Sequence, residues 1–299
     1  MTATLCSAAA GSRPMPNLDP TLDGKLRCVE EMLAGFGKVL VAFSGGVDST
    51  LLAALARQVL GRANVLAVTA DSPSLARADL EEARRLAAAL DLDHLVVATH
   101  ELNDPAYQAN GPGRCFLCKQ ELFETLAALA APRGIPVILY GAIGDDQLAD
   151  RPGQRAAKAA GARAPLQEAG LTKQEVRALA RALGLSNWDR PQNACLASRI
   201  PHGFAVSRET LRRVEGAEAV LRAMGFRQVR VRAAEHHARI EVGADEVARL
   251  HDPALGAEVA RRLEAFGFET VGVDRGGYRP GGADRGAADE VPLGALGAC

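Results

Sequence analysis

The stretch of residues 38–54 constrains the fold of this chain more than any other. Residues 39–43 form an unbroken apolar run, which is typical of a strand buried on both faces of a parallel sheet. The run ends at Ser44-Gly45-Gly46, and apolar residues recur at helical spacing after Asp48. A strand, a glycine turn and a helix N-terminus in this order direct several backbone N–H groups at one point. The stretch therefore predicts a phosphate-binding turn.

The turn itself reads SGGVDST over residues 44–50, and it fits neither the GxxxxGK[ST] loop nor the GxGxxG fingerprint. It resembles the pyrophosphate loop of the PP-loop ATPases, which split ATP into AMP and pyrophosphate to adenylate a substrate. The alternative is a glycine turn in an ordinary α/β domain. The resemblance implies that ATP is bound with Mg²⁺ near Asp48. The predicted nucleotide-binding residues are Ser44, Gly45, Gly46, Val47, Asp48, Ser49, Thr50 and Ser72.

Composition excludes several classes of protein. The 299 residues are 48% hydrophobic and 24% charged, as in globular proteins with one large or two modest domains. The formal net charge of -1 provides no general attraction for RNA, DNA or anionic membranes. The N-terminal region lacks the pattern of a secretory signal, and no run approaches the ~18 apolar residues of a membrane span. We therefore expect a cytoplasmic protein whose partners include neither nucleic acid nor membrane.

Strand and helix patterns alternate through the first two thirds of the chain. Apolar strand-like runs at residues 65–70, 95–99 and 137–140 are separated by helical patterns. This alternation predicts an α/β fold with a parallel sheet, in which ligands gather at the carboxyl ends of the strands. Asp145 and Asp146 follow the last of these strands and are candidates either for metal binding or for capping the next helix.

The pattern changes after about residue 200. Strands are expected at 204–206, 227–234, 238–242 and 269–273, with helices between them, so the order suggests a small α+β domain of ferredoxin-like type. The proline-rich start and the glycine-rich end have the composition of disordered tails. The predicted organisation is a flexible tail at 1–20, a PP-loop ATP-binding domain at 21–200, a substrate or oligomerisation domain at 201–278 and a disordered tail at 279–299.

Three cysteines have a pattern that indicates metal binding or redox chemistry. Cys115 and Cys118 form a C-x-x-C between Arg114 and Lys119, just before a helix expected to begin near Lys119. Helix N-termini and neighbouring cations favour thiolates, and thiolates favour metal ions. Cys195 lies far away in an irregular segment. The three could hold an iron–sulfur cluster with one open iron, zinc with His202 as fourth ligand, or act in redox chemistry, while the plain alternative is that each is a buried apolar residue.

Taken together, the motifs resemble one family. The segments SGGVDST, RCFLCK, GAIGDDQLADRPG, PLQEAGLTKQEVRALARALGL, ACLASRIPHG, VRVR and ARIEV are similar, in that order, to the ATP-dependent sulfur transferases of the LarE family. That family matures the nickel-pincer nucleotide cofactor. The resemblance covers about residues 22–280, and the segment that contains Cys195 distinguishes this branch from other PP-loop enzymes.

The resemblance implies a reaction. The enzyme would use MgATP to adenylate a carboxylate of pyridinium-3,5-biscarboxylic acid mononucleotide, and sulfur would then displace AMP to leave a thiocarboxylate. Some members of the family spend the sulfur of a single cysteine, here Cys195, whereas others hold a 4Fe-4S cluster on three cysteines. With Cys115, Cys118 and Cys195 as the catalytic and cluster-binding set, this chain resembles the cluster type. The family also implies a homo-oligomer, a hexamer or a trimer.

The predicted second domain offers a phosphate site. Arg230 and Arg232 alternate with Val229 and Val231, so a strand places both guanidinium groups on one face and both valines on the core. Two arginines on one face suit the phosphate of a nucleotide substrate, and Arg199 is a further candidate. The alternative is a solvated strand face.

Other functions compete with this interpretation. A tRNA thiolase of the PP-loop class could also use three cysteines and a cluster, although it would need a basic surface to follow the RNA backbone. A nucleotide-sensing or metal-binding module would keep the ATP site without chemistry. An amide-forming PP-loop synthetase would have no need of three thiols.

Overall fold

The computed structural model describes residues 19–148, 152–191, 193–279 and 290–293. The predicted tail at 1–20 lies outside these ranges except for its last two residues. The described residues form two compact units. The first unit comprises residues up to Ser72, then 77–99 and 115–193, and the second comprises 73–76, 100–114 and 194 onward.

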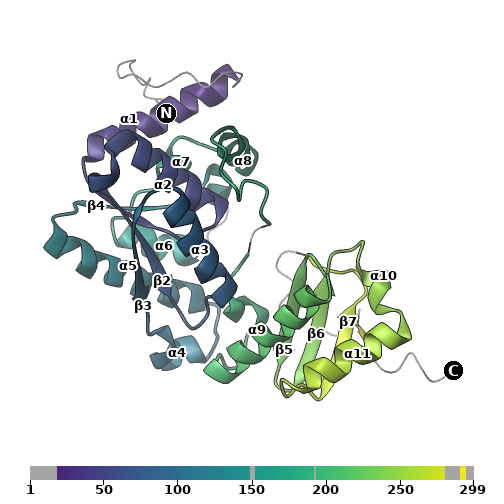
Figure 1. Cartoon of the computed structure of the whole chain (residues 1–299). Helices are drawn as coiled ribbons and strands as arrows, with labels where there is room; N and C mark the ends of the chain where they lie inside the picture. Colours follow the sequence, from purple (N-terminus) through teal and green to yellow (C-terminus); the bar gives the residue numbers. More distant parts are fainter. Residues whose placement is uncertain (1–18, 149–151, 192, 280–289, 294–299) are drawn as a thin grey trace. The chain divides into compact units, whose positions relative to one another are not determined.

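The sheet of the first unit is parallel throughout. Its four strands have the order β3-β2-β1-β4. They are β1 (Val39–Ala42), β2 (Val65–Asp71), β3 (Asp93–Ala98) and β4 (Val137–Tyr140). The predicted α/β class is therefore confirmed (Figure 1). Each of the four strands begins and ends within two residues of its predicted bounds.

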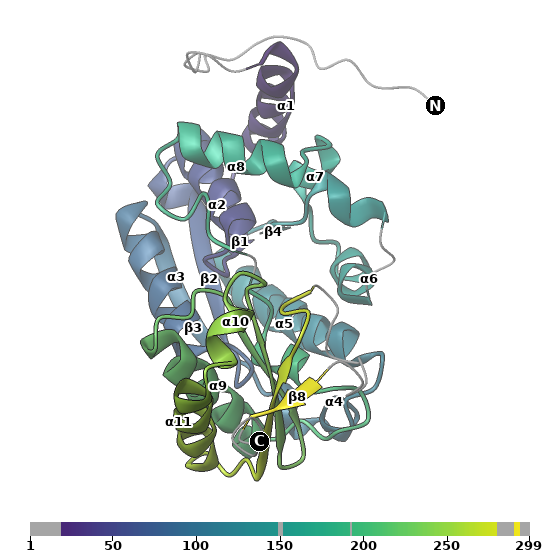
Figure 2. The same ribbon diagram turned by 90° about the vertical axis from the view of Figure 1, so that its right-hand side faces the viewer.

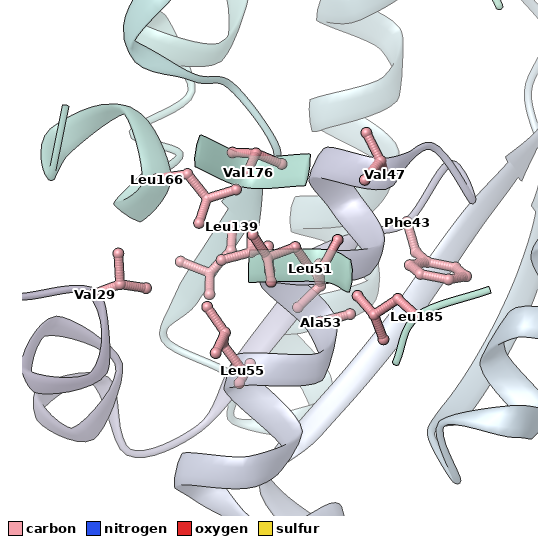
Figure 3. Close-up of a cluster of buried hydrophobic side chains, with 14 of the residues drawn as sticks. Val29, Phe43, Val47, Leu51, Ala53, Leu55, Leu139, Leu166, Val176 and Leu185 are labelled. Carbon is pink, nitrogen blue, oxygen red and sulfur yellow. The ribbon is translucent and has the colours of Figure 1, made fainter. Parts of the chain in front are cut away.

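Helices cover both faces of this sheet. They are α1 (Pro20–Phe36), α2 (Val47–Leu60), α3 (Arg77–Ala89), α5 (Arg114–Ala130), α6 (Pro152–Ala159), α7 (Pro165–Glu168) and α8 (Lys173–Ala182). On one face, Figure 3 shows Leu51 and Leu55 of α2 among Val29, Leu139 and Val176, all at most 1% exposed. On the other face, residues of α5 join a second core cluster with residues of β1 and β2. Burial of these apolar faces fixes α2, and with it the turn that precedes α2.

The second unit has its own four-stranded sheet with the order β5-β6-β7-β8. Its elements are α4 (Pro105–Gln108), α9 (Arg208–Ala223), β5 (Val229–Ala234), β6 (His237–Val242), α10 (Val247–Leu250), α11 (Pro253–Glu264), β7 (Thr270–Asp274) and β8 (Glu290–Pro292). The pairs β5–β6 and β7–β8 are antiparallel, and β6–β7 is parallel. Helices α9 and α11 contact each other, as Figure 2 also shows.

The structure confirms an α+β second domain but not the ferredoxin-like order. Residues 204–206 form no strand, because the Val206 N–H donates to the Gln108 carbonyl at 2.9 Å instead of entering a sheet. The segment expected to be a disordered tail contains a strand that the sequence did not predict, β8 (Figure 2). This strand pairs with β7. The other described positions of that segment are 279 and 293, and the rest of it lies outside the described residues.

The chain passes into the second unit at residue 194, and two earlier segments also belong to that unit. Asn110 explains part of this assignment. Its amide nitrogen donates to the carbonyl oxygens of Ile200, Pro201 and Phe204, which ties residues 100–114 to the start of the second unit's main segment. Within the described ranges, no helix is both long enough and apolar enough to cross a bilayer.

Candidate functional site

The turn between β1 and α2 is held in shape by two serines. The Ser49 hydroxyl lies 3.0 Å from the Ser44 hydroxyl and donates to the Gly46 carbonyl at 3.0 Å. The Ser44 N–H donates to the Ser49 hydroxyl at 3.2 Å. Among the described residues, no side chain caps the N-terminus of α2 at Gly46. The first turn of α2 therefore presents backbone N–H groups and the positive end of the helix dipole, which is the predicted phosphate cradle.

Two glycines are required by the geometry of this cradle. Gly45 has φ +71°, and a Cβ there would lie 3.1 Å from the Ala83 Cα. Gly141, which follows β4, approaches α2 so closely that a Cβ would lie 2.7 Å from the Ser49 nitrogen. A side chain at position 141 would therefore push into the first turn of α2. The sequence pointed to Gly45 through the motif but gave Gly141 no role.

Asn187 stabilises the cradle by hydrogen bonds to the turn and to α2. It is 2% exposed, and its amide nitrogen donates to the Gly45 carbonyl at 3.0 Å and to the Thr50 hydroxyl at 3.0 Å. Its amide oxygen has no hydrogen-bond partner within the part of the chain that the structure describes. Sequence reasoning missed this residue, because it lies 142 positions from Gly45 and in no motif.

The predicted nucleotide-binding residues do not all face the same way. The Val47 side chain is 4% exposed and belongs to the core. The Thr50 side chain is fully buried, and its N–H donates to the Gly46 carbonyl at 2.9 Å. Ser72 follows β2, next to β1 in the sheet. The groups left for a phosphate chain are therefore mainly the exposed Ser44 hydroxyl and the backbone N–H groups before Thr50.

Asp48, in the first turn of α2, is paired with Lys173. The Lys173 ammonium donates to both carboxylate oxygens, at 2.8 and 2.7 Å. Burial raises the pKa of the Asp48 carboxyl, and the hydrogen bond and charge of Lys173 oppose that rise. Magnesium in nucleotide sites takes one or two protein carboxylates together with phosphate and water oxygens. Asp48, 24% exposed beside the cradle, fits that role.

Asp146 lies near the same carboxylate, and Asp145 contacts the backbone of Lys173. Asp145 accepts the Lys173 N–H at 2.8 Å, so it supports the start of α8. Asp146 accepts the Ile143 N–H at 3.2 Å within its own turn, and its negative charge contributes to the raised pKa of Asp48. Capping of a helix, one of the two predicted roles, is thus seen for Asp145, although the helix is α8 and not the next one along the chain.

The C-x-x-C pair lies inside a helix and not before it. Helix α5 begins at Arg114, five residues earlier than expected, so Cys115 lies in its first turn, Cys118 lies at the start of its second turn, and the two face the same side at a spacing of three. Cys115 and Cys195 are exposed and Cys118 is half-buried, and no cysteine in the described ranges forms a disulfide. Across those ranges, no three His, Cys, Asp or Glu side chains are grouped to hold a metal ion. Assembly of the three cysteines around a cluster stays a prediction.

Arg199 organises the segment around Cys195. Its side chain is 1% exposed and bonds to Glu218 through two nitrogens, at 2.8 and 3.2 Å. A third nitrogen donates to the Cys195 carbonyl at 3.0 Å. From the other side, Arg114 donates to the Ala197 carbonyl at 2.7 Å. The short helical turn Leu196–Arg199 is thus fixed by buried guanidinium groups.

Arg230 and Arg232 belong to a buried layer of charge, and not to a solvated face. They are 7% and 6% exposed, while Val229 and Val231 on the opposite face are core residues, as predicted. Arg232 lies opposite Arg239 of β6, and Arg230 lies opposite Glu241. We call this set the arginine layer; it consists of Arg199, Arg230, Arg232 and Arg239 with Glu218 and Glu241. Arg239 is a member that the sequence analysis missed.

The carboxylates of the arginine layer are fully engaged. Glu241 accepts from Arg232 at 2.7 Å and from Arg239 at 3.3 Å. Burial alone would raise the pKa of Glu218, but the hydrogen bond and charge of Arg199, with Arg222 and Arg230, hold that pKa below its usual range. The guanidinium of Arg230 lies 5.1 Å from the centre of the Tyr278 ring, and its pKa is lowered by burial and then by the charge of Arg199. The layer holds more guanidinium groups than carboxylates, which favours an anionic ligand.

Comparison with known proteins agrees with this geometry. Residues 27–132 match the NAD synthase family. An uncharacterised protein of Synechocystis sp. is 42% identical over 265 residues, which are 88% of this chain and 98% of the relative. The pyridinium-3,5-bisthiocarboxylic acid mononucleotide synthase of Lactiplantibacillus plantarum is 38% identical over 262 residues, 87% of this chain and 94% of the relative. This chain belongs to the LarE family.

Membership of the LarE family confirms the predicted PP-loop fold and an enzyme of that class. The argininosuccinate synthase of Haloarcula marismortui matches a smaller part, being 32% identical over 130 residues, 39% of this chain and 30% of that protein. The similarity to argininosuccinate synthase is limited to part of the chain, whereas the similarity to the pyridinium-3,5-bisthiocarboxylic acid mononucleotide synthase includes both units. The roles of individual residues in the cradle, the cysteine pair and the arginine layer are predictions for this family member.

Proposed function

We propose that the protein is an AMP-forming sulfur transferase that converts a carboxylate of pyridinium-3,5-biscarboxylic acid mononucleotide into a thiocarboxylate. The observation that carries the proposal is the uncapped first turn of α2, a pyrophosphate cradle, in a chain similar over 87% of its length to a pyridinium-3,5-bisthiocarboxylic acid mononucleotide synthase. A carboxylate cannot lose its oxygen unless that oxygen becomes part of a good leaving group. Adenylation accomplishes this at the expense of ATP.

In the first step, a carboxylate oxygen of the substrate forms a bond to the α-phosphorus of ATP, and pyrophosphate leaves with the electrons of the broken bond. The products are an acyl-adenylate and pyrophosphate. Backbone N–H groups at the start of α2 and the exposed hydroxyl of Ser44 would stabilise the charge on the departing pyrophosphate. Asp48 would hold the Mg²⁺ that accompanies the phosphates.

In the second step, a nucleophilic sulfur forms a bond to the activated carbonyl carbon, and AMP leaves with the electrons of the C–O bond. Cys115, Cys118 and Cys195 would hold a 4Fe-4S cluster, which supplies sulfide when bound. The position of Cys115 and Cys118 within the first two turns of α5 and the exposure of Cys115 and Cys195 support this assignment. If Cys195 alone is the sulfur source, its sulfur forms the bond to the carbonyl carbon, and its Cβ–Sγ bond then breaks with loss of the α-proton to leave dehydroalanine. The other two thiols have no part in that transfer.

The arginine layer would bind the phosphate of the nucleotide substrate. The support for this assignment is that Arg199, Arg230 and Arg232 are buried in one layer that holds more guanidinium groups than carboxylates. We further propose that the partner is this small molecule and not a nucleic acid, and that the protein is a homo-oligomer.

Two measurements test the proposal. Anaerobically purified protein is mixed with MgATP and the biscarboxylate nucleotide, and pyrophosphate is measured; release that does not depend on the nucleotide contradicts the substrate assignment. Bulk tRNA in its place is the control for a tRNA thiolase. Iron and sulfide are then assayed in the wild type, Cys115→Ala and Cys118→Ala, with Cys28→Ala as a matched control. A colourless, zinc-containing wild type after anaerobic reconstitution contradicts the cluster.

A further inference from the structure

The ion pair between Lys173 and Asp48 lies at the predicted phosphate site and involves the carboxylate proposed to bind magnesium. The ammonium donates to both oxygens of the one carboxylate in the first turn of the cradle helix. The two side chains are 27% and 24% exposed, so a ligand can reach them. The carboxylate proposed for magnesium is therefore already occupied by a cation of the protein.

Only the side chain of Lys173 is free to move away. Its backbone N–H is bonded to Asp145, and the residue before it, Thr172, forms a capping box with Glu175. These contacts fix the start of α8 beside α2, and the two helices pack against each other. The flexible four-carbon stem of a lysine can then carry the ammonium from one acceptor to another nearby.

A bound polyphosphate supplies that second acceptor. A divalent cation at Asp48 repels the ammonium and takes its acceptor oxygens, while phosphate oxygens in the cradle offer new ones of higher charge. With the metal alone, Lys173 loses its partner Asp48 and gains no phosphate acceptor. With the polyphosphate alone, Lys173 can bind the phosphates only by leaving the Asp48 carboxylate without a cation. The two ligands together satisfy every charge.

We propose that Lys173 is an exchangeable counter-ion, which pairs with Asp48 in the empty enzyme and transfers to the nucleotide polyphosphate when the divalent cation binds Asp48. Cation and polyphosphate then bind as a coupled pair, and AMP, which lacks the pyrophosphate, does not recruit the lysine. This inference rests on the proposed use of MgATP, but it concerns binding only and requires no sulfur transfer.

The chain provides a matched control. Lys25 pairs with Glu175 at 2.8 Å, with side chains 26% and 24% exposed, and Glu175 lies in the same helix α8. If Lys173 were merely structural, Lys173→Met and Lys25→Met would have the same consequences. Thermal unfolding of both variants, and of Lys173→Gln as a second replacement, shows whether each is folded.

Binding is measured with the full-length protein, using Mn²⁺ as a spectroscopic stand-in for Mg²⁺ and α,β-methylene-ATP as an uncleavable nucleotide. In the wild type, each ligand is expected to increase the affinity for the other. In Lys173→Met, the affinity for α,β-methylene-ATP with Mn²⁺ should fall about tenfold or more, because a charge-assisted contact is lost. Mn²⁺ alone should bind this variant more tightly than the wild type, and AMP should bind both equally.

The outcomes separate the two proposals. If Lys173→Met and Lys173→Gln match Lys25→Met for Mn²⁺, α,β-methylene-ATP and AMP, the counter-ion role is wrong while the proposed ATP-dependent reaction stands. Equal loss of AMP and α,β-methylene-ATP affinity also overturns it, since that result indicates a general distortion of the site. If the folded wild type binds neither α,β-methylene-ATP nor pyrophosphate, the proposed function fails together with the inference.

Discussion

The cradle of the first unit and the arginine layer of the second unit both favour anions, but they are built from different groups. The cradle consists mainly of backbone N–H groups and serine hydroxyls, and it depends on glycine where β4 approaches α2. The arginine layer consists of buried side chains that need Glu218 and Glu241 to balance them. A backbone site carries fixed partial charges, whereas a buried ionic site exists only while each charge has a partner. We therefore expect the cradle to be sensitive to added volume and the layer to lost charge.

The largest effect is expected from removing a carboxylate of the arginine layer. Glu218 is 1% exposed and pairs with Arg199 and Arg222. Glu218→Ala leaves Arg199 buried without its counter-charge, so the free energy of unfolding should fall by ~3–5 kcal/mol. Chemical denaturation measures this loss.

The control for that variant is Glu258→Ala on α11, where Arg261 and Arg262 pair with a glutamate whose side chain is 32% exposed, against 1% for Glu218. Exposed pairs contribute little to stability, so unfolding of this variant should follow the wild type. If the Glu218 and Glu258 variants are equally stable, the arginine layer does not depend on balanced charge, and the comparison between the two sites breaks down.

The next largest effect is steric and concerns the cradle. Gly141→Ala would place a methyl group 2.7 Å from the Ser49 nitrogen and 3.0 Å from the Asp48 carbonyl carbon. We expect ~1–3 kcal/mol of destabilisation from this overpacking. Displacement of the first turn of α2 should weaken ATP binding about a hundredfold, because hydrogen bonds to charged groups contribute ~1.5–3 kcal/mol each. Titration of the nucleotide measures it.

Gly24→Ala is the matched change, because a Cβ there meets no atom within 4 Å and the residue lies inside α1. Alanine has the higher helix propensity, so this variant should gain up to ~1 kcal/mol and bind ATP normally. Normal ATP binding by folded Gly141→Ala would show that the cradle tolerates added volume.

The cradle and the arginine layer also differ in how well the sequence could predict them. The cradle was predictable because its residues are contiguous and because strand, turn and helix are each determined by local patterns. The capping box of Thr172 and Glu175 likewise follows from a local pattern, the T-x-x-E spacing of residues 172–175. Only the contributions from distant residues were missed there, namely Gly141, Lys173 and Asn187, which are brought to α2 by the parallel sheet and by α8.

The arginine layer was predictable only in part. Alternation on β5 correctly placed Arg230 and Arg232 on one face. That this face is buried, and that Arg239 and Glu241 lie opposite, depends on the register with β6, which no local pattern specifies. The ferredoxin-like order failed for a related reason, since Glu290–Pro292 pairs with β7 from a segment whose composition carried no strand signal.

A smaller effect is expected at Asn187, where the cradle meets the rest of the first unit. Asn187→Ala removes the donor to the Gly45 carbonyl and to the Thr50 hydroxyl. Loss of one buried hydrogen bond to each group should weaken ATP binding by about tenfold. The control is Asn64→Ala, which removes an exposed amide donor to the Leu60 carbonyl. If AMP binding falls as much as ATP binding, Asn187 supports the whole fold and not the phosphate cradle.

The smallest effect concerns pH, and here the two sites should differ in sign. The folded-state pKa of Glu218 is lowered, so the stability it contributes is present above its unfolded pKa of about 4.3 and is lost as the pH falls through the folded value. Asp48 has a raised pKa, mainly through burial, so its contribution is present below the unfolded pKa of about 3.9 and is lost as the pH rises through the folded value. One carboxylate therefore favours folding when ionised, and the other disfavours it.

This contrast is tested with the variants Glu218→Gln and Asp48→Asn. The free energy of unfolding of each is compared with that of the wild type in magnesium-free buffer, from acid to neutral pH. Relative to the wild type, Glu218→Gln should become less stable as the pH rises, because only the wild type gains from ionisation. Asp48→Asn should become relatively more stable over the same range, because it avoids ionising a carboxylate that is three quarters buried. Two differences of the same sign would mean that Lys173 compensates Asp48 as completely as Arg199 compensates Glu218. The pair of Asp48 and Lys173 would then be as balanced as the pair of Glu218 and Arg199, and the two sites would not differ in how their charges are compensated.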